Sequence, residues 1–157
     1  MLKNLNPFTP DYKDQFEIWD LLIRRDFEAF LQQDWEAIAE DYLADGFYGL
    51  DFKKSTIESN WKLGYANLET YRKEWIKESE RFKQISFLVN PRNILYECCR
   101  LEHWQIMDSK CSVHKVFNGS LPVHEADPIL LRWRSIFLLQ RNNYKWKITG
   151  FIGYMNL

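Results

Sequence analysis

The C-terminal part of the chain holds two long segments that a tight turn can join into a hairpin. Residues 130–141 and 144–155 are rich in bulky apolar side chains, and Asn142-Asn143 stands between them. Asparagine tolerates the left-handed backbone that a two-residue hairpin turn requires. The sequence therefore predicts a long antiparallel hairpin whose apolar face must pack on a second layer of structure.

Pairing across that turn assigns each side chain to a face, because side chains alternate along a strand. Ser135 is expected opposite Gly150, and Trp133 opposite Ile152. The apolar face also holds Leu131, Phe137, Leu139, Trp146, Ile148 and Tyr154. The other face is mixed and includes Arg132, Arg134, Ile136, Leu138 and Phe151. We expect the first face to cover helices and the second to meet water or a partner.

The first half of the chain has the apolar spacing of helices. Thr9 can cap a first helix and Pro10 suits its first turn. An apolar stripe follows at helical spacing: Phe16, Trp19, Ile23, Phe27 and Phe30. Asp34 is expected to cap a second helix and Asn67 a third, with a short strand over residues 47–52 between them.

Strand and turn signals replace the helical spacing from Ile85 onward. Residues 94–107 predict a strongly bent strand after the break at Asn90-Pro91, and residues 111–117 predict another strand. Helices therefore come first and strands follow, which is the order expected of an α+β fold.

Composition and charge fit one globular domain over residues 1–157, with residues 1–8 as a flexible or packing segment. Hydrophobic residues make up 46% and charged residues 27%, which excludes a disordered chain. Lys+Arg 21 and Asp+Glu 22 leave a net charge of -1, without the basic surplus that a nucleic-acid-binding protein needs. The most apolar stretch, residues 129–139, is too short to cross a membrane.

The start of the chain and the cysteines indicate a cytoplasmic protein. Residues 1–8 contain no apolar stretch of signal-peptide length. Cys98 and Cys99 are adjacent and Cys111 stands apart, a spacing that is typical of neither a disulfide framework nor a zinc site. We expect reduced thiols and no cofactor.

Three local segments carry a resemblance to a known family. They are Asp26-Phe27-Glu28-Ala29-Phe30 through Asp34-Trp35, Ala44-Asp45-Gly46-Phe47, and Tyr144-Lys145-Trp146-Lys147-Ile148. With the order of elements from about Asp11 to Tyr154, they resemble the nuclear transport factor 2-like superfamily, and most of all its polyketide-cyclase-like (SnoaL-like) branch. The resemblance implies a cone-shaped, curved antiparallel sheet that wraps around three helices of the N-terminal half and leaves a cavity between them.

Asp51 is the first candidate for catalysis. It shares a strand face with Phe47 and Gly49, so burial beside apolar groups would favour a general base. The segment around it also resembles the strand that carries the proton-abstracting aspartate of ketosteroid isomerases. The alternative is that Asp51 ends its strand and accepts hydrogen bonds from the following turn, near Lys53 and Lys54. Asp26 and Phe27 stand where those isomerases carry a tyrosine, so steroid isomerisation is not expected.

His103 is the second candidate for catalysis. Strict alternation groups it with Leu101 and Gln105, on the less charged face of its strand, where a histidine can orient a ligand or exchange protons. The alternative is a hydrogen-bonded core histidine. His114 and His124 lack the spacing of a metal site, so no metal is expected.

Several aromatic side chains are candidates to line the cavity. They are Trp61, Tyr71, Trp75, Trp133 and Tyr154, and their default role is in the core. Ser135, as a small residue on a bulky face, is expected to leave a hollow beside them. The alternative is that the protein's own tryptophans fill the interior.

Arg132 and Arg134 lie on the mixed face of the hairpin with apolar neighbours, which indicates an interface. Because relatives of the resembled fold commonly dimerise through this surface, a homodimer is predicted. The alternative is that Glu97 or Glu102 pairs with the arginines in a solvated ladder.

These observations together predict a protein that binds a small hydrophobic or aromatic molecule without a reaction assigned to it. One alternative is a lyase, isomerase or cyclase in which Asp51 removes a proton and His103 or Tyr154 steadies the product. A second is a protein-interaction module that acts through the outer face of the sheet.

Overall fold

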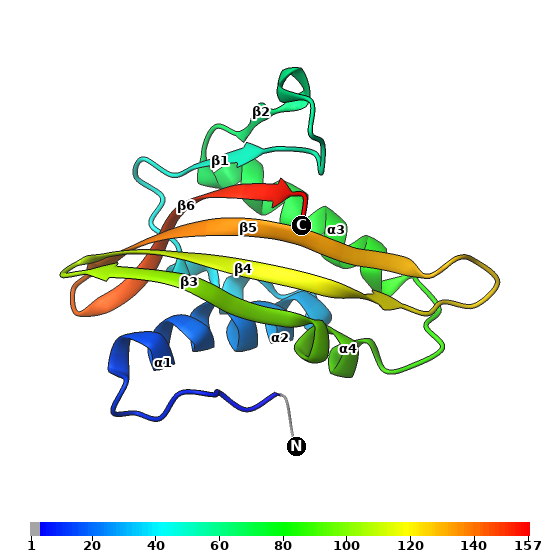
Figure 1. Cartoon of the computed structure of the whole chain (residues 1–157), viewed down its shortest axis with the longest axis horizontal. Coiled ribbons are helices and arrows are strands. Elements are labelled where there is room, and N and C mark those ends of the chain that lie inside the picture. Colours follow the sequence, from blue (N-terminus) through cyan, green and yellow to red (C-terminus); the bar gives the residue numbers. More distant parts are fainter. Residues whose placement is uncertain (1–3) are drawn as a thin grey trace.

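The computed structural model describes residues 4–157 and contains one six-stranded sheet. The strands are β1 (Tyr48–Asp51), β2 (Lys62–Tyr65), β3 (Cys99–Met107), β4 (Lys110–Leu121), β5 (Ile129–Asn142) and β6 (Lys145–Met155). Their order across the sheet is β2-β1-β6-β5-β4-β3 (Figure 1). All neighbours pair antiparallel except β1 and β6, which are parallel.

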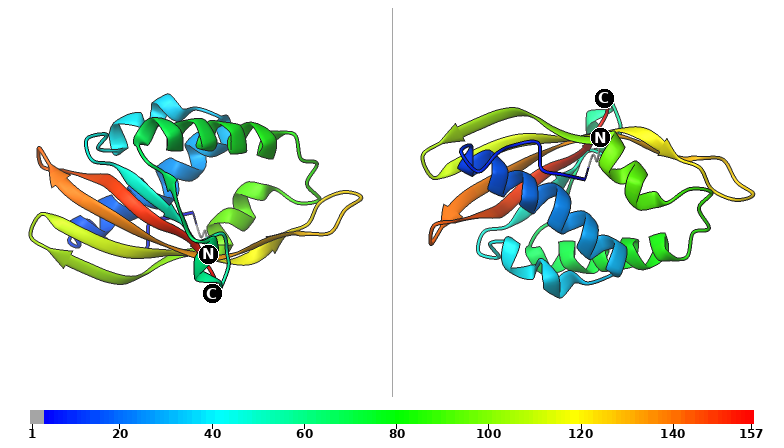
Figure 2. Two further views of the ribbon diagram at one scale, coloured as in Figure 1. Left: turned by 90° about the horizontal axis from the view of Figure 1, so that it is seen from above. Right: turned by 90° about the horizontal axis from the view of Figure 1, so that it is seen from below.

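Helices cover one face of this sheet. The helices are α1 (Lys13–Trp19), α2 (Asp26–Gln32), α3 (Leu68–Lys83) and α4 (Pro91–Cys98). A π-helical segment, Asp20–Arg25, joins α1 directly to α2, so that residues 13–32 form one helical rod. The sheet curves around the helices, as Figure 2 shows. The predicted α+β fold with a curved sheet wrapped around helices is confirmed.

The predicted helix starts are correct at one position and need correction at others. Asn67 Oδ1 accepts a hydrogen bond of 2.9 Å from the Thr70 amide and begins α3. Asp34 accepts from the Ala37 amide at 3.3 Å, but the segment that follows is a short 3-10 turn, Trp35–Ala37. The first helix begins at Lys13, later than Pro10.

The predicted bent strand over residues 94–107 is wrong in its first half. Asn90 Oδ1 accepts from the Arg92 amide at 3.0 Å and Pro91 begins a helix, α4. Leu95 and Tyr96 on this helix are buried against the core. The strand β3 therefore begins only at Cys99.

The terminal hairpin is present, but its register differs from the predicted one. Asn142 pairs with Lys145, so the turn residues are Asn143 and Tyr144, both with positive φ. Thr149 is an extra residue between the pairs Leu139–Ile148 and Leu138–Gly150. This bulge reverses the faces of β6 beyond it, because one inserted residue shifts the alternation.

The bulge places Phe151 opposite Phe137 on the inner face, where Phe151 is 3% exposed. The predicted pairs Ser135–Gly150 and Trp133–Ile152 do not form. A second irregularity lies between Arg134 and Ile136, opposite Ile152 to Met155. At this point the Ser135 hydroxyl accepts a hydrogen bond of 3.3 Å from the Tyr154 amide.

Aromatic and aliphatic side chains fill the space between the sheet and the helices. One cluster includes Leu22, Trp35, Tyr42, Phe47, Trp75, Trp146 and Phe151, and another includes Ile23, Phe27, Leu95, Tyr96, Phe117 and Leu131. The Trp35 ring, for example, contacts the rings of Tyr42, Tyr71 and Trp75. The predicted packing of the inner hairpin face on the helices is observed as far as the bulge. Beyond it Phe151, predicted on the outer face, packs inward, and Ile152, predicted on the inner face, lies on the outer one.

Two further expectations concern the start of the chain and the membrane. Of the segment 1–8, residues 1–3 lie outside the described part. Phe8 packs edge-on against Trp104, and the Asn6 side-chain amide donates to the Phe16 carbonyl at 2.8 Å. Within residues 4–157, the helices are too short or too polar to span a bilayer.

Candidate functional site

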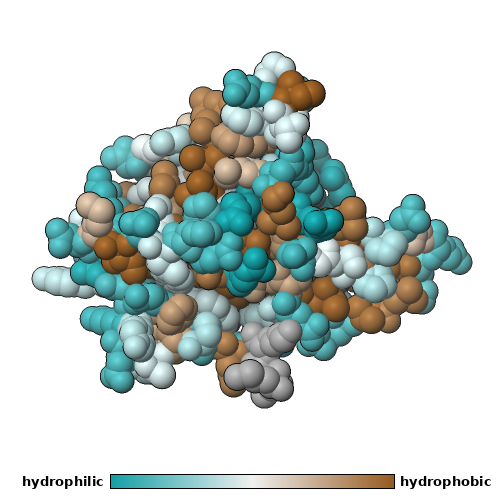
Figure 3. All heavy atoms as spheres, viewed as in Figure 1, coloured by the Kyte–Doolittle hydropathy of each residue, from teal (hydrophilic) through white to brown (hydrophobic). Residues whose placement is uncertain are grey.

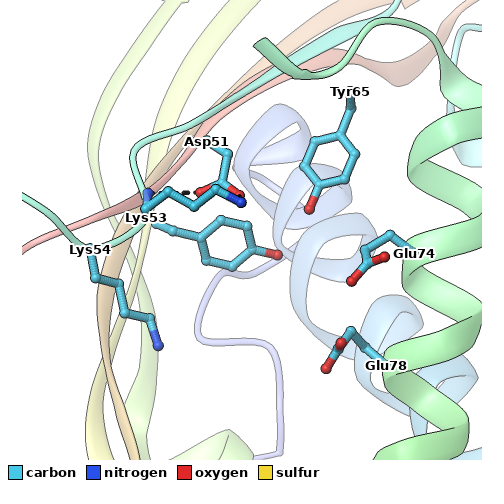
Figure 4. Close-up of a pocket in the computed structure, with 7 residues that line it drawn as sticks. Asp51, Lys53, Lys54, Tyr65, Glu74 and Glu78 are labelled. Carbon is cyan, nitrogen blue, oxygen red and sulfur yellow. Dashed lines mark hydrogen bonds and ion pairs between the residues drawn. The ribbon is translucent and has the colours of Figure 1, made fainter. Parts of the chain in front are cut away.

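A cavity of about 400 Å³ opens at the edge of the sheet, between β1, β2, the end of β6 and helix α3 (Figure 4). Seven residues line it: Asp51, Lys53, Lys54, Tyr65, Glu74, Glu78 and Tyr154. Five of these side chains carry charge and two are phenols. The lining is therefore polar and aromatic, not mainly apolar as predicted.

Aromatic packing explains why the interior of the cone is closed. Tyr71 lies against the rings of Phe47, Tyr65 and Phe151, at centroid distances of 5.7, 5.3 and 5.1 Å. One inner cavity, of about 10 Å³, lies beside Asp26 and Lys115. It has room for about one water molecule. The cavity of about 400 Å³ at the sheet edge has room for a larger guest.

Asp51 ends β1 and holds the turn that follows. Its Oδ1 accepts from the Lys53 amide at 2.8 Å, and its Oδ2 pairs with Lys53 Nζ at 3.0 Å. The residue is 7% exposed. The turn contact is the one that the structural alternative for Asp51 predicts. Asp51 also lines the cavity. It therefore holds the turn, as the structural alternative expects, from a position where a catalytic candidate could also reach a ligand.

Tyr65 and Tyr154 form the aromatic part of the cavity wall. Burial and the charge of Asp51 raise the pKa of Tyr65 to about 12. Burial, with the neighbouring phenols of Tyr71 and Tyr65, holds the pKa of Tyr154 well above its usual value. Both side chains are therefore neutral phenols at physiological pH, able to donate or accept a hydrogen bond.

Charges of opposite sign stand on two walls. Glu74 and Glu78 project from one face of α3 toward the strands, and Lys53 and Lys54 lie on the opposite side (Figure 4). Lys54 Nζ lies 4.6 Å from the ring centroid of Trp133. This division of charge is the main electrostatic feature of the cavity.

The other predicted ligand-binding residues lie outside the cavity lining. Tyr71 and Trp75 pack in the core. Trp61 stacks on Phe52 at 4.2 Å and its indole donates to the Ser55 carbonyl. Trp133 stacks on Phe117 at 4.5 Å beneath Lys54, and Ser135 is buried at the bulge that positions Tyr154. Asp51 and Tyr154 are the two that the structure brings together.

His103 lies on the outer face of the sheet, away from the cavity. It is an extra residue between the pairs Glu102–His114 and Gln105–Ser112, with φ of 55°. This bulge turns Trp104 and Ile106 inward and leaves the His103 side chain 65% exposed. The His103 ring lies 4.9 Å from that of His114. Strict alternation missed this position because it allows for no inserted residue.

Two of the cavity residues that were not predicted, Glu74 and Glu78, have a signal in the sequence. Glu74 and Glu78 are four residues apart and therefore share a face of α3, but a mixed charge pattern on a helix is typical of a solvated face. Tyr65 and Lys54 have no sequence signal, because strand β2 and the turn after β1 bring them to the cavity only in the folded chain. No group of three His, Cys, Asp or Glu side chains within residues 4–157 is placed to hold a metal ion.

No family model matches the sequence, and no curated protein matches it. Solved structures do. One from Exiguobacterium sibiricum, described as a putative Ca/calmodulin-dependent kinase II association domain, has a TM-score of 0.57 at 15% identity and covers 96% of this chain and 97% of its own. An NTF2-like protein of unknown function from Methylobacillus flagellatus has a TM-score of 0.54 at 11% identity, with 97% of each chain covered.

A third structure, from Novosphingobium aromaticivorans, is described as an NTF2-like protein with a cystatin-like fold. Its TM-score is 0.54 at 12% identity, and it covers 92% of this chain and 82% of its own. The chain has the nuclear transport factor 2-like fold. At identities this low, structural similarity establishes the fold alone, because one fold serves many biochemical functions. Membership of the polyketide-cyclase-like branch stays a prediction.

Proposed function

We propose that this NTF2-like chain is a binding module for a small aromatic molecule, which it holds in the cavity beside β1 and α3. The cavity of about 400 Å³ carries the proposal, because small-molecule sites commonly measure about 300–1,000 Å³. Tyr65 and Tyr154 supply two aromatic faces with neutral hydroxyl groups for contact and orientation. The charged side chains around them favour an aromatic body that carries polar groups over a pure hydrocarbon.

The test is a titration of isotope-labelled protein, followed by amide chemical shifts in NMR spectra. The probes share one ring and differ in charge: 4-methylbenzyl alcohol, 4-methylbenzylamine, 4-methylbenzoate and 4-(aminomethyl)benzoate. At least one probe is expected to shift the amides of Asp51, Lys53 and Tyr65. Glu74→Trp, which fills the cavity, should remove the response, and Glu80→Trp on an exposed position of the same helix should retain it. Absence of a response to every probe would contradict the proposal.

A catalytic role is the second candidate, because Asp51 and the Tyr65 and Tyr154 hydroxyls share one cavity. In this role Asp51 is the general base of a lyase, isomerase or cyclase. Both carboxylate oxygens already contact Lys53, so the base must first exchange a partner, which is why binding alone is the better-supported function. Deuterium exchange into phenylacetone, measured by NMR, tests proton removal. Exchange that Asp51→Asn abolishes would support catalysis, and exchange no faster than in buffer would oppose it.

A homodimer through the outer face of β4 and β5 is the proposed assembly. Ile136 and Leu138 lie half-buried on this face, and hydrophobic and hydrophilic side chains are mixed over these strands (Figure 3). Arg134 already pairs with Glu102 at 2.9 Å, as the solvated alternative expects. The similar structure described as an association domain supports assembly of this fold. Sedimentation should show a dimer that Leu138→Glu dissociates. Monomers at high concentration would oppose it, and capture of an unlike protein would favour an interaction module.

A reducing compartment such as the cytoplasm is the proposed location. Cys98, Cys99 and Cys111 are all free thiols. Burial raises the pKa of Cys99 to about 12, which keeps its reactive thiolate rare. Mass spectrometry of protein isolated from cells under alkylation should find the three thiols reduced.

A further inference from the structure

We infer that the cavity selects a dipolar molecule, with a cationic group at Glu74 and Glu78, an anionic group at Lys54, and a planar body between them. This inference rests on the proposed binding function and names the chemical class of its ligand. Three observations support it. The acidic wall and the basic wall each have a charged group that is available to a ligand, and the backbone of the basic wall is held in an energetically unfavourable conformation.

The acidic wall is formed by two carboxylates on one helix face. Glu74 and Glu78 are four residues apart on α3, so their side chains are neighbours, and both project into the cavity (Figure 4). Glu78 also pairs with Arg81, whose side chain is 61% exposed, and within residues 4–157 Glu74 has no ion-pair partner. Like charges four residues apart on a helix repel each other, and a bound cation between them removes that repulsion.

The basic wall has one committed and one available lysine. Lys53 Nζ pairs with the buried Asp51 carboxylate, which leaves this pair nearly neutral. Within residues 4–157 Lys54 has no ion-pair partner, and its Nζ lies 4.6 Å from the ring centroid of Trp133. Its charge is therefore available to an anionic group that enters the cavity.

The backbone at this wall adopts an unfavourable conformation. Lys53, Lys54 and Tyr154 have φ values of 55°, 53° and 58°, in the left-handed region that side chains other than glycine rarely adopt. Specific hydrogen bonds hold each one: Lys53 N to Asp51, Lys54 N to the Tyr154 carbonyl at 2.6 Å, and Tyr154 N to Ser135. Such conformations gather at binding and catalytic sites, where the surroundings over-determine them.

Separated charges of opposite sign discriminate between ligand classes. A ligand with one charge is attracted by one wall and repelled by the other. A dipolar ligand of the right orientation is attracted by both, and the tyrosine rings between the walls contact its planar part. The same argument predicts that the preference weakens at high salt, because the walls are partly exposed to water.

The four matched probes of the titration above test this inference when dissociation constants are compared at low salt. We expect 4-(aminomethyl)benzoate to bind about threefold to tenfold more tightly than 4-methylbenzylamine, 4-methylbenzoate or the neutral alcohol, as partly exposed charge pairs allow. Glu74→Gln should reduce the affinity for the dipolar and cationic probes and increase that for 4-methylbenzoate, which the carboxylate repels. Lys54→Gln should reduce the affinity for the dipolar and anionic probes and increase that for the amine.

Exposed positions on α3 supply the controls. Glu80→Gln and Lys77→Gln change charge by the same amounts outside the cavity lining and should leave the order of affinities unchanged. Equal affinity for all four probes, or weaker binding of the dipolar one, would overturn the dipolar preference while the binding function stands. If no probe shifts the cavity amides, the binding function fails and this inference fails with it.

Discussion

Lys115 on β4 and Asp26 at the start of α2 form an ion pair of 3.0 Å in the interior of the molecule. Lys115 Nζ also donates to the Leu22 carbonyl at 2.5 Å, and Asp26 Oδ1 accepts from the Trp75 indole at 3.2 Å. Leu22 lies in the π-helical segment. This network links the sheet, the helical rod and α3.

Replacement of Lys115 should therefore destabilise the fold strongly. Lys115→Met keeps much of the aliphatic length but removes the charge that pairs with Asp26 Oδ2 and the donor to the Leu22 carbonyl, while Asp26 Oδ1 keeps the Trp75 indole. Loss of one partner from a buried pair costs about 3–5 kcal/mol, and because Asp26 is 24% exposed we expect about 3 kcal/mol. Urea unfolding measures this loss. Lys110→Met on the same strand, at an exposed position, should change the free energy of unfolding by less than about 0.5 kcal/mol.

Asp51 should prove important for stability through the acceptor that it offers to the Lys53 amide. Asp51→Asn retains an oxygen for this bond and loses only the ion pair with the exposed Lys53 side chain. Asp51→Ala removes both contacts and should lower the free energy of unfolding by about 1–2 kcal/mol. Denaturant titrations compare the two variants. Equal losses would show that the turn does not depend on this acceptor.

The overall architecture follows from features that a sequence displays directly. Asn67 caps α3, the apolar stripe from Phe16 to Phe30 defines the helical rod, and the long terminal segments form the central strands. These features depend on local spacing and hydrogen-bonding capacity, and local spacing is what periodicity measures. The helix α4 was missed because its eight residues give too short a pattern to separate from a strand.

Bulges account for the errors within the strands. His103 and Thr149 are extra residues in β3 and β6, and each reverses the alternation beyond it. Their position is set by how the curved sheet closes around the helices, which is a property of the whole fold. For the same reason the prediction missed that Phe151 packs inward, into space that the predicted register left open.

The observed register can be tested with a pair of adjacent substitutions. Phe151→Ala removes a ring that contacts Phe47, Tyr65 and Tyr71, and should cost about 3–5 kcal/mol. Ile152→Ala on the opposite face should cost about 1 kcal/mol, because its side chain is only half-buried. Thermal and urea unfolding give both values. A larger loss of stability for Ile152→Ala than for Phe151→Ala would contradict the bulge and favour the register predicted without it.

His114 should make the stability of the protein depend on pH. Burial and the charges of Arg134 and His103 lower its pKa from 6.5, and Glu102 opposes them. Its Nδ1 lies 3.0 Å from Arg134 Nη1, a contact that favours the neutral ring. In the window between the lowered pKa and 6.5 the unfolded chain binds more protons than the folded one, so the free energy of unfolding falls as the pH drops through this window.

A comparison of urea unfolding at pH 7.5 and 5.5 isolates the contribution of His114. His114→Gln can still accept from Arg134 and does not titrate, so this variant should lose less stability between the two pH values than the unmodified protein. His124→Gln at an exposed position should behave like the unmodified protein. The three proteins share their carboxylates, so the comparison reports the difference that His114 makes. An unchanged pH dependence in His114→Gln would mean that the folded environment does not oppose protonation of this ring.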